Sequence, residues 1–250
     1  MKTLLLIMSI LISSSLTQKL SDPLTIWLVG DSTMSKKEVK AYPETGWGMP
    51  FSNFWDSTVT IENRAVNGRS TKSFLAENRW QPILEKIRPG DYVLIQFGHN
   101  DESKDKGERY SPPAEFKANL KKYITEAREK KAIPVLITPA GRRKFDSSGH
   151  VMETHAEYAA LVKESARENN VTLIDLNEKS KELYEKYGPE NSKLLFNHLQ
   201  PGEHPNYPDG KIDDTHFNEL GARKIAQLVL QEIRTLLPEL ATRIKQIRKK

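Results

Sequence analysis

The sequence contains no cysteine among its 250 residues. That absence excludes a fold held by disulfides, a thiol nucleophile, a Cys-based zinc site and an anchor attached to a cysteine. The chain also shows no repeat with a period of about 20 to 50 residues, which argues against a repeat array. The fold must therefore be held by its core, and a hydrophobic content of 37% over this length allows a large one.

The first residues have the layout of an export signal. Lys2 precedes an apolar segment over residues 4–12, and small polar residues follow it. This segment is too short to cross a bilayer, so we predict a cleaved signal peptide over residues 1–19. The protein is then exported, periplasmic or extracellular, with no stable membrane insertion after cleavage. A buried N-terminal helix is the alternative.

The net charge of +5 is concentrated at the end of the chain. Without the export segment and the last ten residues, the chain is close to neutral. We therefore expect no nucleic-acid partner, and we assign residues 241–250 to a basic C-terminal tail. A solvated helix end is the simplest explanation of that tail, and a weak attraction to an anionic polymer or membrane surface is the alternative.

Short apolar runs alternate with helical patterns along the rest of the chain. The predicted strands cover residues 25–30, 59–66, 92–97, 134–138 and 171–175. Apolar residues at helical spacing predict helices around residues 116–127, 158–165 and 220–236. Several strands are apolar on both faces, which is typical of a parallel sheet covered by helices. We predict one α/β domain over residues 20–240, a doubly wound three-layer α/β/α sandwich.

Polar residues follow the predicted strands, at the edge where open α/β sheets bind ligands. They are Ser32 after the first strand, Gly68 after the second, Asn100 after the third, Arg142 and Arg143 after the fourth, and Asp213 and His216 before the last helix. Two long connections rich in proline and glycine, within residues 34–56 and 187–215, adjoin this set. In a compact domain such connections are usually functional or mobile.

Three of these residues have the chemistry of acyl transfer. A serine hydroxyl needs a base at neutral pH, an imidazole is the usual base, and the imidazole needs a carboxylate to orient it. Asp213 and His216 lie three residues apart, so one turn of chain can present both on one side. We predict that Ser32, His216 and Asp213 are catalytic. The backbone N–H groups of Ser32 and Gly68 and the amide of Asn100 could then bind the oxyanion.

Neighbouring polar residues leave alternatives open. Asp31 is expected to cap the turn after the first strand rather than to move protons. Asp214 is a rival to Asp213 as the carboxylate, and the spacing favours Asp213. Arg142 and Arg143 either lie in a solvated turn or hold a ligand carboxylate by paired hydrogen bonds.

The other histidines and the tryptophans support weaker hypotheses. The histidines expected in loops or at the surface are His99, His150, His155, His198 and His204. The tryptophans that either stack on sugars or lie in the core are Trp47, Trp55 and Trp80. The loop over residues 203–216 holds oxygen and nitrogen ligands but matches no metal motif, so we predict neither a metal nor another cofactor.

The order of the motifs resembles the SGNH, or GDSL, hydrolase superfamily over nearly the whole mature chain. The matching blocks are Gly30-Asp31-Ser32, Gly68, Gly98-x-Asn100-Asp101 and Asp213-x-x-His216. Thr33, where leucine is common, and the segments Asn67-Gly68-Arg69-Ser70 and Thr138-Pro139 are similar to the rhamnogalacturonan acetylesterases of that superfamily. No Gly-x-Ser-x-Gly motif is present, which argues against the α/β-hydrolase fold.

The resemblance implies a flavodoxin-like sheet, a triad of Ser32, Asp213 and His216, and an oxyanion hole made by Ser32, Gly68 and Asn100. It also implies removal of acetyl groups from pectic rhamnogalacturonan, as polymer or oligosaccharide. One alternative is an esterase or lysophospholipase that acts on lipid acyl chains, and another is a deacetylase of a different polysaccharide such as xylan. A third is a carbohydrate-binding protein without turnover.

Overall fold

The computed structural model describes residues 22–246. The strands are β1 (Leu24–Gly30), β2 (Val59–Asn63), β3 (Tyr92–Gln96), β4 (Ile133–Ile137) and β5 (Thr172–Ile174). The α-helices are α1 (Gly48–Phe51), α2 (Thr71–Ala76), α3 (Gln81–Leu84), α4 (Pro113–Glu129), α5 (Ala156–Glu168), α6 (Leu176–Asn191), α7 (Glu219–Leu236) and α8 (Pro238–Ala241). Short 3-10 helices are η1 (Val39–Ala41), η2 (Ser52–Phe54), η3 (Lys104–Arg109) and η4 (Ser192–Leu195). The predicted signal peptide lies outside the described residues.

The five strands form one parallel sheet in the order β2-β1-β3-β4-β5. This is the flavodoxin-like order, so the predicted fold class is confirmed. The order reverses between β1 and β3, and the crevice beyond the carboxyl ends of those two strands is where such sheets bind ligands. Ser32 follows β1 and Asn100 follows β3, so both lie at this switch point.

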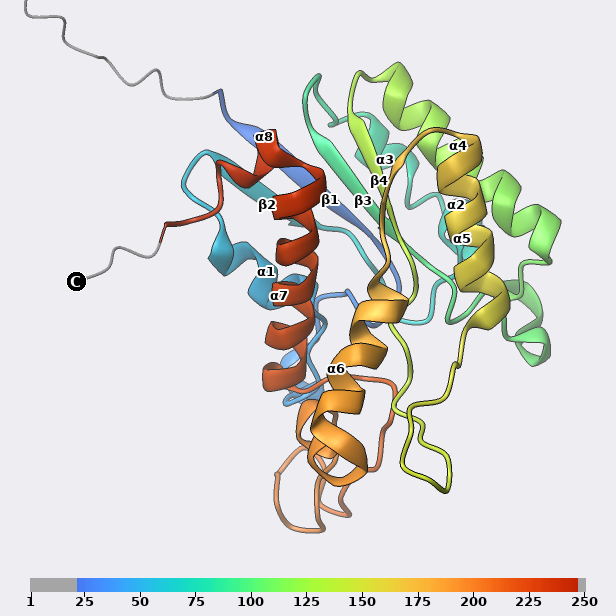
Figure 1. The fold of residues 1–250 in the computed structure, drawn as a ribbon. Coiled ribbons are helices and arrows are strands. Elements are labelled where there is room, and N and C mark those ends of the chain that lie inside the picture. The colour runs from blue at the N-terminus through green and yellow to red at the C-terminus, as the bar shows by residue number, and fades with distance from the viewer. Residues whose placement is uncertain (1–21, 247–250) are drawn as a thin grey trace, which may run out of the picture.

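Helices cover both faces of the sheet (Figure 1), with α1, α6, α7 and α8 on one side and α2 to α5 on the other. The alternation along β1 explains how one strand serves both layers. Ile26 and Leu28 pack under the first group of helices, whereas Trp27 and Val29 pack under the second. All four side chains are buried, which is why the strand reads as a continuous apolar run.

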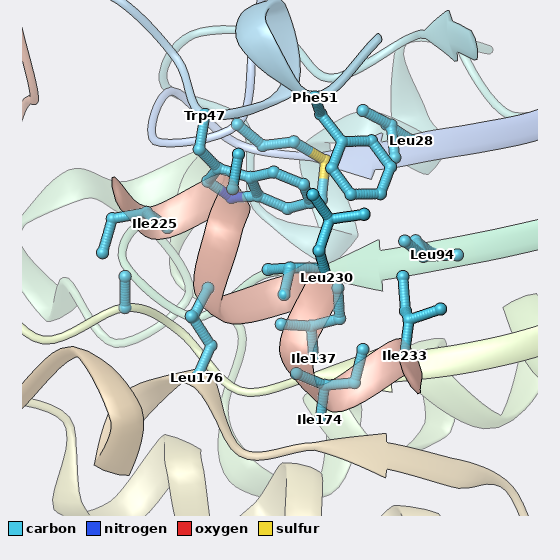
Figure 2. Close-up of a cluster of buried hydrophobic side chains, with 14 of the residues drawn as sticks. Leu28, Trp47, Phe51, Leu94, Ile137, Ile174, Leu176, Ile225, Leu230 and Ile233 are labelled. Atoms are coloured by element: carbon cyan, nitrogen blue, oxygen red, sulfur yellow. The ribbon is translucent and has the colours of Figure 1, made fainter. Parts of the chain in front are cut away.

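Helix α7 is the main cover of the first face (Figure 2). The side chain of Asn218 caps its start by accepting a hydrogen bond from the Gly221 N–H at 3.0 Å. Ile225, Val229 and Ile233 recur every four residues and form the buried stripe that packs on the sheet. The helix ends before Pro238, as the sequence predicts.

The connections that carry the candidate residues gather at one edge of the sheet. In Figure 1 the loop between α6 and α7 and the loop after β4 both lie at the lower edge, where the strands end. The segment after β2 stays attached there, because the N–H groups of Arg64 and Val66 donate to the β1 carbonyls of Leu28 and Gly30. The strand predicted over residues 59–66 is therefore shorter in the structure, because the regular pairing of β2 with β1 stops at Asn63.

The folded domain extends beyond the predicted boundary at residue 240. Helix α8 ends at Ala241, and Ile244 is only 4% exposed and bridges to Trp55. The first part of the predicted tail is therefore packed against the core, and residues 247–250 lie outside the described residues. Among residues 22–246, no helix is both long enough and apolar enough to cross a membrane.

Gly221 gives a test of how α7 is seated. A Cβ added at this position would lie 1.8 Å from the carbonyl oxygen of Leu195. Helix propensity favours alanine over glycine by roughly 1 kcal/mol. The clash of the added Cβ with the Leu195 carbonyl outweighs this gain. We expect Gly221→Ala to lower the free energy of unfolding by roughly 1–3 kcal/mol in urea denaturation. Gln231→Ala, on an exposed position of α7, should stay within about 0.5 kcal/mol of the wild type. A stabilised Gly221→Ala variant would contradict this packing.

Candidate active site

The turn after β1 presents Ser32 at the sheet edge. The carboxylate of Asp31 is buried and accepts hydrogen bonds from the Thr33 N–H at 3.0 Å and the Thr33 hydroxyl at 2.8 Å. Asp31 therefore caps the turn, as predicted, and burial raises the pKa of its carboxyl. Gln96 at the end of β3 donates to the Thr33 hydroxyl and accepts from the indole N–H of Trp47. This buried network fixes the backbone that carries Ser32.

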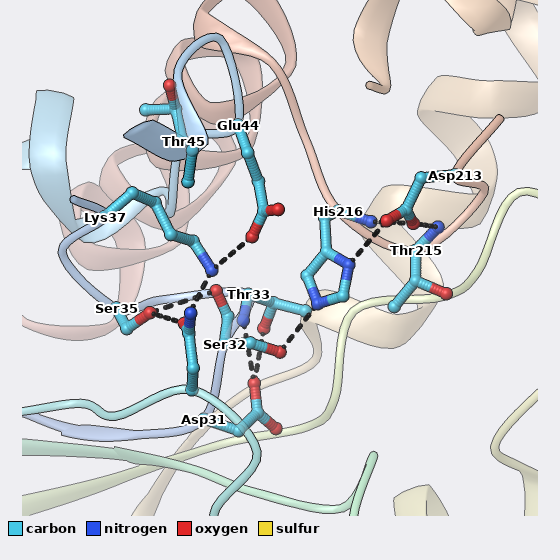
Figure 3. Close-up of polar contacts among 12 residues, drawn as sticks. Asp31, Ser32, Thr33, Ser35, Lys37, Glu44, Thr45, Asp213, Thr215 and His216 are labelled. Atoms are coloured by element: carbon cyan, nitrogen blue, oxygen red, sulfur yellow. Dashed lines mark hydrogen bonds and ion pairs between the residues drawn. The ribbon is translucent and has the colours of Figure 1, made fainter. Parts of the chain in front are cut away.

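The structure brings Ser32, His216 and Asp213 into one chain of hydrogen bonds (Figure 3). Nε2 of His216 lies 2.9 Å from Oγ of Ser32, and Nδ1 lies 2.9 Å from Oδ2 of Asp213. The other carboxylate oxygen of Asp213 accepts from the backbone N–H groups of Thr215 and His216, each at 2.9 Å. The carboxylate thus orients both the imidazole and the loop on which the imidazole stands.

Asp213 is held in its charged form. Burial works against the charge, but the hydrogen bonds from His216 and the backbone, and the attraction to the imidazole when it is protonated, outweigh it, so the pKa of Asp213 lies well below its usual range. Asp214, which the sequence offered as the alternative carboxylate for His216, contacts other residues instead. Its Oδ1 accepts from Arg143 at 2.7 Å and lies 2.8 Å from Nε2 of His198. The geometry therefore selects Asp213 as the partner of His216.

The candidate oxyanion donors lie on two loops tied to each other. The amide of Asn100 donates to the carbonyl of Arg69 at 3.0 Å, and an amide nitrogen carries a second hydrogen that remains available. The backbone N–H groups of Ser32 and Gly68 donate to no other group within the described residues. Gly68 adopts a positive φ of 72°, which a glycine accepts without strain.

Lys37 and Glu44 complete the site, and the sequence analysis missed both. The ammonium of Lys37, whose side chain is 2% exposed, lies 2.7 Å from Oε1 of Glu44 and donates to Oδ1 of Asn67 at 2.7 Å. Ser35 donates to the same oxygen at 2.5 Å. Asn67 precedes Gly68, so these bonds position the loop with the candidate oxyanion donor. No spacing rule connects a lysine and a glutamate that flank the short 3-10 helix η1.

A sequence model of the GDSL-like lipase/acylhydrolase family matches residues 28–224. The chain belongs to this family. The predicted resemblance to SGNH hydrolases is thereby confirmed, and the matched segment contains every candidate residue of the site. Family membership is consistent with the parallel sheet and with the position of Ser32 after its first strand.

Three relatives extend the comparison. The chain is 47% identical over 214 residues to the rhamnogalacturonan acetylesterase RhgT of Bacillus subtilis, covering 86% of this chain and 91% of that protein. It is 39% identical over 227 residues to YesY, a probable rhamnogalacturonan acetylesterase of the same organism, covering 88% and 98%. The crystal structure of YxiM from Bacillus subtilis superposes with a TM-score of 0.73 at 29% identity, covering 85% of this chain and 56% of that one.

His99 and His155 lie in loops, as expected, but both are buried in the interior rather than placed at the surface. They are 4% and 1% exposed, and their rings meet with centroids 4.2 Å apart. Nδ1 of His155 lies 2.9 Å from Glu102, and burial lowers the pKa of His99. Loop position alone did not reveal this, because the loops after β3 and β4 pack on each other.

The two arginines after β4 have different surroundings. Arg143 is 11% exposed in its side chain, and its guanidinium donates to Asp214, to the Ser192 hydroxyl and to the carbonyl of Pro189. Its donors are thus engaged by the protein. Arg142 is more open and donates to the hydroxyl of Thr215 at 2.7 Å. Of the two, only Arg142 remains a candidate substrate ligand.

The tryptophans lie in the core, with Trp47, Trp55 and Trp80 all buried, so they do not present rings to a sugar. Within residues 22–246, ligand atoms of Glu44, Asp213 and His216 lie within 4.8 Å of one another. However, Lys37 pairs with Glu44, and both nitrogens of His216 have hydrogen-bond partners. These side chains are arranged for hydrogen bonding rather than as a cation cage.

The Lys37–Glu44 pair can be tested through stability. Removing the ammonium in Lys37→Ala leaves the Glu44 carboxylate without its partner at a largely buried site. We expect a loss of roughly 2–4 kcal/mol in the free energy of unfolding. Lys36→Ala removes the exposed neighbouring lysine and should change stability by less than about 0.5 kcal/mol in the same urea titration. Equal losses of stability in the two variants would contradict a stabilising Lys37–Glu44 pair.

Asp101 predicts a pH dependence of stability. It is fully buried, accepts from the N–H and hydroxyl of Thr71, and burial raises its pKa from the ordinary 3.8 to about 7. The folded state therefore keeps a proton that the unfolded state loses, so this contribution is complete below about pH 4 and is lost as the pH rises to about 7. We expect the Tm advantage of the wild type over Asp101→Asn to shrink between pH 4.5 and 8. A constant difference across that range would contradict the shift.

Proposed function

We propose that this protein is a serine esterase that removes acetyl groups from rhamnogalacturonan. The observation that carries the proposal is the hydrogen-bonded chain from Ser32 through His216 to Asp213, next to unused backbone donors at Ser32 and Gly68. The 47% identity to RhgT supports the substrate. Arg142, which is partly exposed, donates to Thr215 and lies 3.4 Å from Glu102, is the candidate ligand for a galacturonate carboxylate.

In the first step, the Ser32 oxygen attacks the acetyl carbonyl carbon while Nε2 of His216 takes the hydroxyl proton. Asp213 accepts the hydrogen bond from Nδ1 and stabilises the imidazolium. The negative oxygen that forms is bound by the Ser32 and Gly68 N–H groups and by the Asn100 amide. The C–O bond to the sugar then breaks, and the sugar oxygen leaves with the proton from His216.

In the second step, water attacks the acetyl group on Ser32 and gives its proton to the same imidazole. The tetrahedral intermediate collapses, acetate leaves, and the proton returns to the Ser32 oxygen. No metal and no organic cofactor takes part in either step. The low pKa of Asp213 keeps it anionic throughout, so it supports His216 in both directions of proton transfer.

We further propose that residues 1–19 direct export and that the mature chain works outside the cytoplasm. The charged start, the short apolar segment and the small polar residues after it support this. A polysaccharide too large to enter a cell would meet the enzyme there. We place the hydrolase domain from near residue 20 to just after Ile244, which is the last buried side chain among residues 22–246.

Acetate release from three substrates tests the proposal. Acetylated rhamnogalacturonan, acetylated xylan and a long-chain acyl ester are compared in parallel, with Ser32→Ala as the control. We expect the highest kcat/KM on rhamnogalacturonan and a loss of at least about 10³-fold in Ser32→Ala. His216→Ala should lose activity to a similar extent, because serine and base act as a unit.

Each other outcome points to a specific error. Preference for xylan, or activity that rises with acyl chain length, would keep the triad and replace the substrate. Activity that survives in Ser32→Ala would overturn the mechanism. Failure of an organophosphonate to label Ser32 in the wild type would favour a carbohydrate-binding protein without turnover.

A further inference from the structure

Arg109 lies against the candidate oxyanion loop, in the segment that follows the Gly98-x-Asn100-Asp101 motif. It is the last residue of η3. A Cβ built on Gly68 would lie 3.1 Å from Nη1 and 3.3 Å from Cζ of Arg109, so the guanidinium covers the side of Gly68 that lacks a side chain. The same loop is tied to β1 through Val66 and to Asn100 through Arg69. Arg109 is therefore at the rim of the site.

Among residues 22–246, the guanidinium of Arg109 differs from those of the nearby arginines because no carboxylate of the protein pairs with it. Arg69 pairs with Glu77 at 3.0 Å, Arg142 lies 3.4 Å from Glu102, and Arg143 pairs with Asp214. For Arg109, no carboxylate among residues 22–246 comes within ion-pair distance and no hydrogen-bond acceptor is found there. The residue is exposed. A charged fork of donors is thus presented to solvent at the rim.

We propose that Arg109 binds the carboxylate of a uronate residue in the substrate, at a subsite next to the oxyanion loop. This inference rests on the proposed function, because an acetyl carbonyl bound at Gly68 brings its sugar chain over the adjacent surface. Rhamnogalacturonan carries galacturonate, whose planar carboxylate matches the guanidinium fork. Gly68 has a second role here, because a side chain at this position would push the guanidinium away.

This subsite accounts for selectivity rather than for chemistry. The carboxylate is not at the reacting carbon, so its contact with Arg109 is made in both the ground state and the transition state. Such uniform binding lowers KM more than it raises kcat. An acetylated neutral polysaccharide such as xylan would not make this contact, so Arg109 would favour acidic over neutral substrates.

The test compares one oligosaccharide in two charge states. Acetylated rhamnogalacturonan oligosaccharides are assayed for acetate release with free carboxylates and after conversion of these carboxylates to neutral methylamides. In Arg109→Gln, we expect the ratio of kcat/KM on the acidic to that on the neutral form to fall about five- to tenfold, mainly through KM. Arg109→Lys should retain part of the ratio, since it keeps the charge but loses the fork.

Arg234→Gln is the matched control. Arg234 is exposed near the end of α7, far along the helix from His216, and it should keep the wild-type ratio and the wild-type activity. An unchanged ratio in Arg109→Gln would overturn the subsite, and so would an equal loss on both substrate forms. If the wild type releases no acetate from either form, the proposed function fails instead, and the subsite falls with it.

Discussion

The hydrogen bond between Ser32 and His216 depends on how α7 docks on the sheet. The two residues are 184 positions apart, and one follows β1 whereas the other directly precedes α7. Sliding the helix by one turn would move His216 by about 5.4 Å, which would break a contact of 2.9 Å. The stripe that includes Ile225, Val229 and Ile233 prevents such a shift, because its side chains are buried against the strands. Core packing far from the site thus sets the distance on which the proposed proton transfer depends.

Buried polar groups beneath the site have a similar structural role. Asp31, Thr33 and Gln96 are removed from water, and their hydrogen bonds offset the cost of burial. Because hydrogen bonds are directional, this network specifies one conformation of the turn, which apolar contacts would not. Asp101 and Thr71 do the same for the loops that carry Asn100 and Gly68. The candidate oxyanion donors are therefore held in position by the folded chain itself.

Charges around the imidazole are balanced by specific partners. The carboxylates of Asp213 and Glu44 both lie close to His216. Asp213 is stabilised by His216 and two backbone N–H groups, whereas Glu44 pairs with the buried ammonium of Lys37. Burial lowers the pKa of Lys37, and Glu44 opposes that shift, so each charge supports the other. Arg143 binds Asp214 next to this region, so few donors of its guanidinium are left for a ligand.

Much of the fold and the centre of the site could be predicted from the sequence. Apolar runs such as residues 25–30 mark the parallel strands, and glycine, hydroxyl and acid residues mark their carboxyl ends, because these local signals persist whatever the rest of the chain does. The ordered blocks from Gly30-Asp31-Ser32 to Asp213-x-x-His216, with Gly68 and Gly98-x-Asn100-Asp101 between them, identified the family, and the spacing of Asp213 and His216 was sufficient to pair them.

Contacts between distant segments were decided only by the tertiary structure. The burial of His99 against His155 and the engagement of Arg143 by Asp214 join loops that have no common period or motif. The pairing of Lys37 with Glu44 lies within one connection, but no motif predicts it. The position of Arg109 over Gly68 is of the same kind. A sequence carries the chemical type of each side chain, but whether a charge meets a partner, water or a substrate depends on which loops pack together. That packing follows from the docking of the helices on the sheet, which no local pattern encodes.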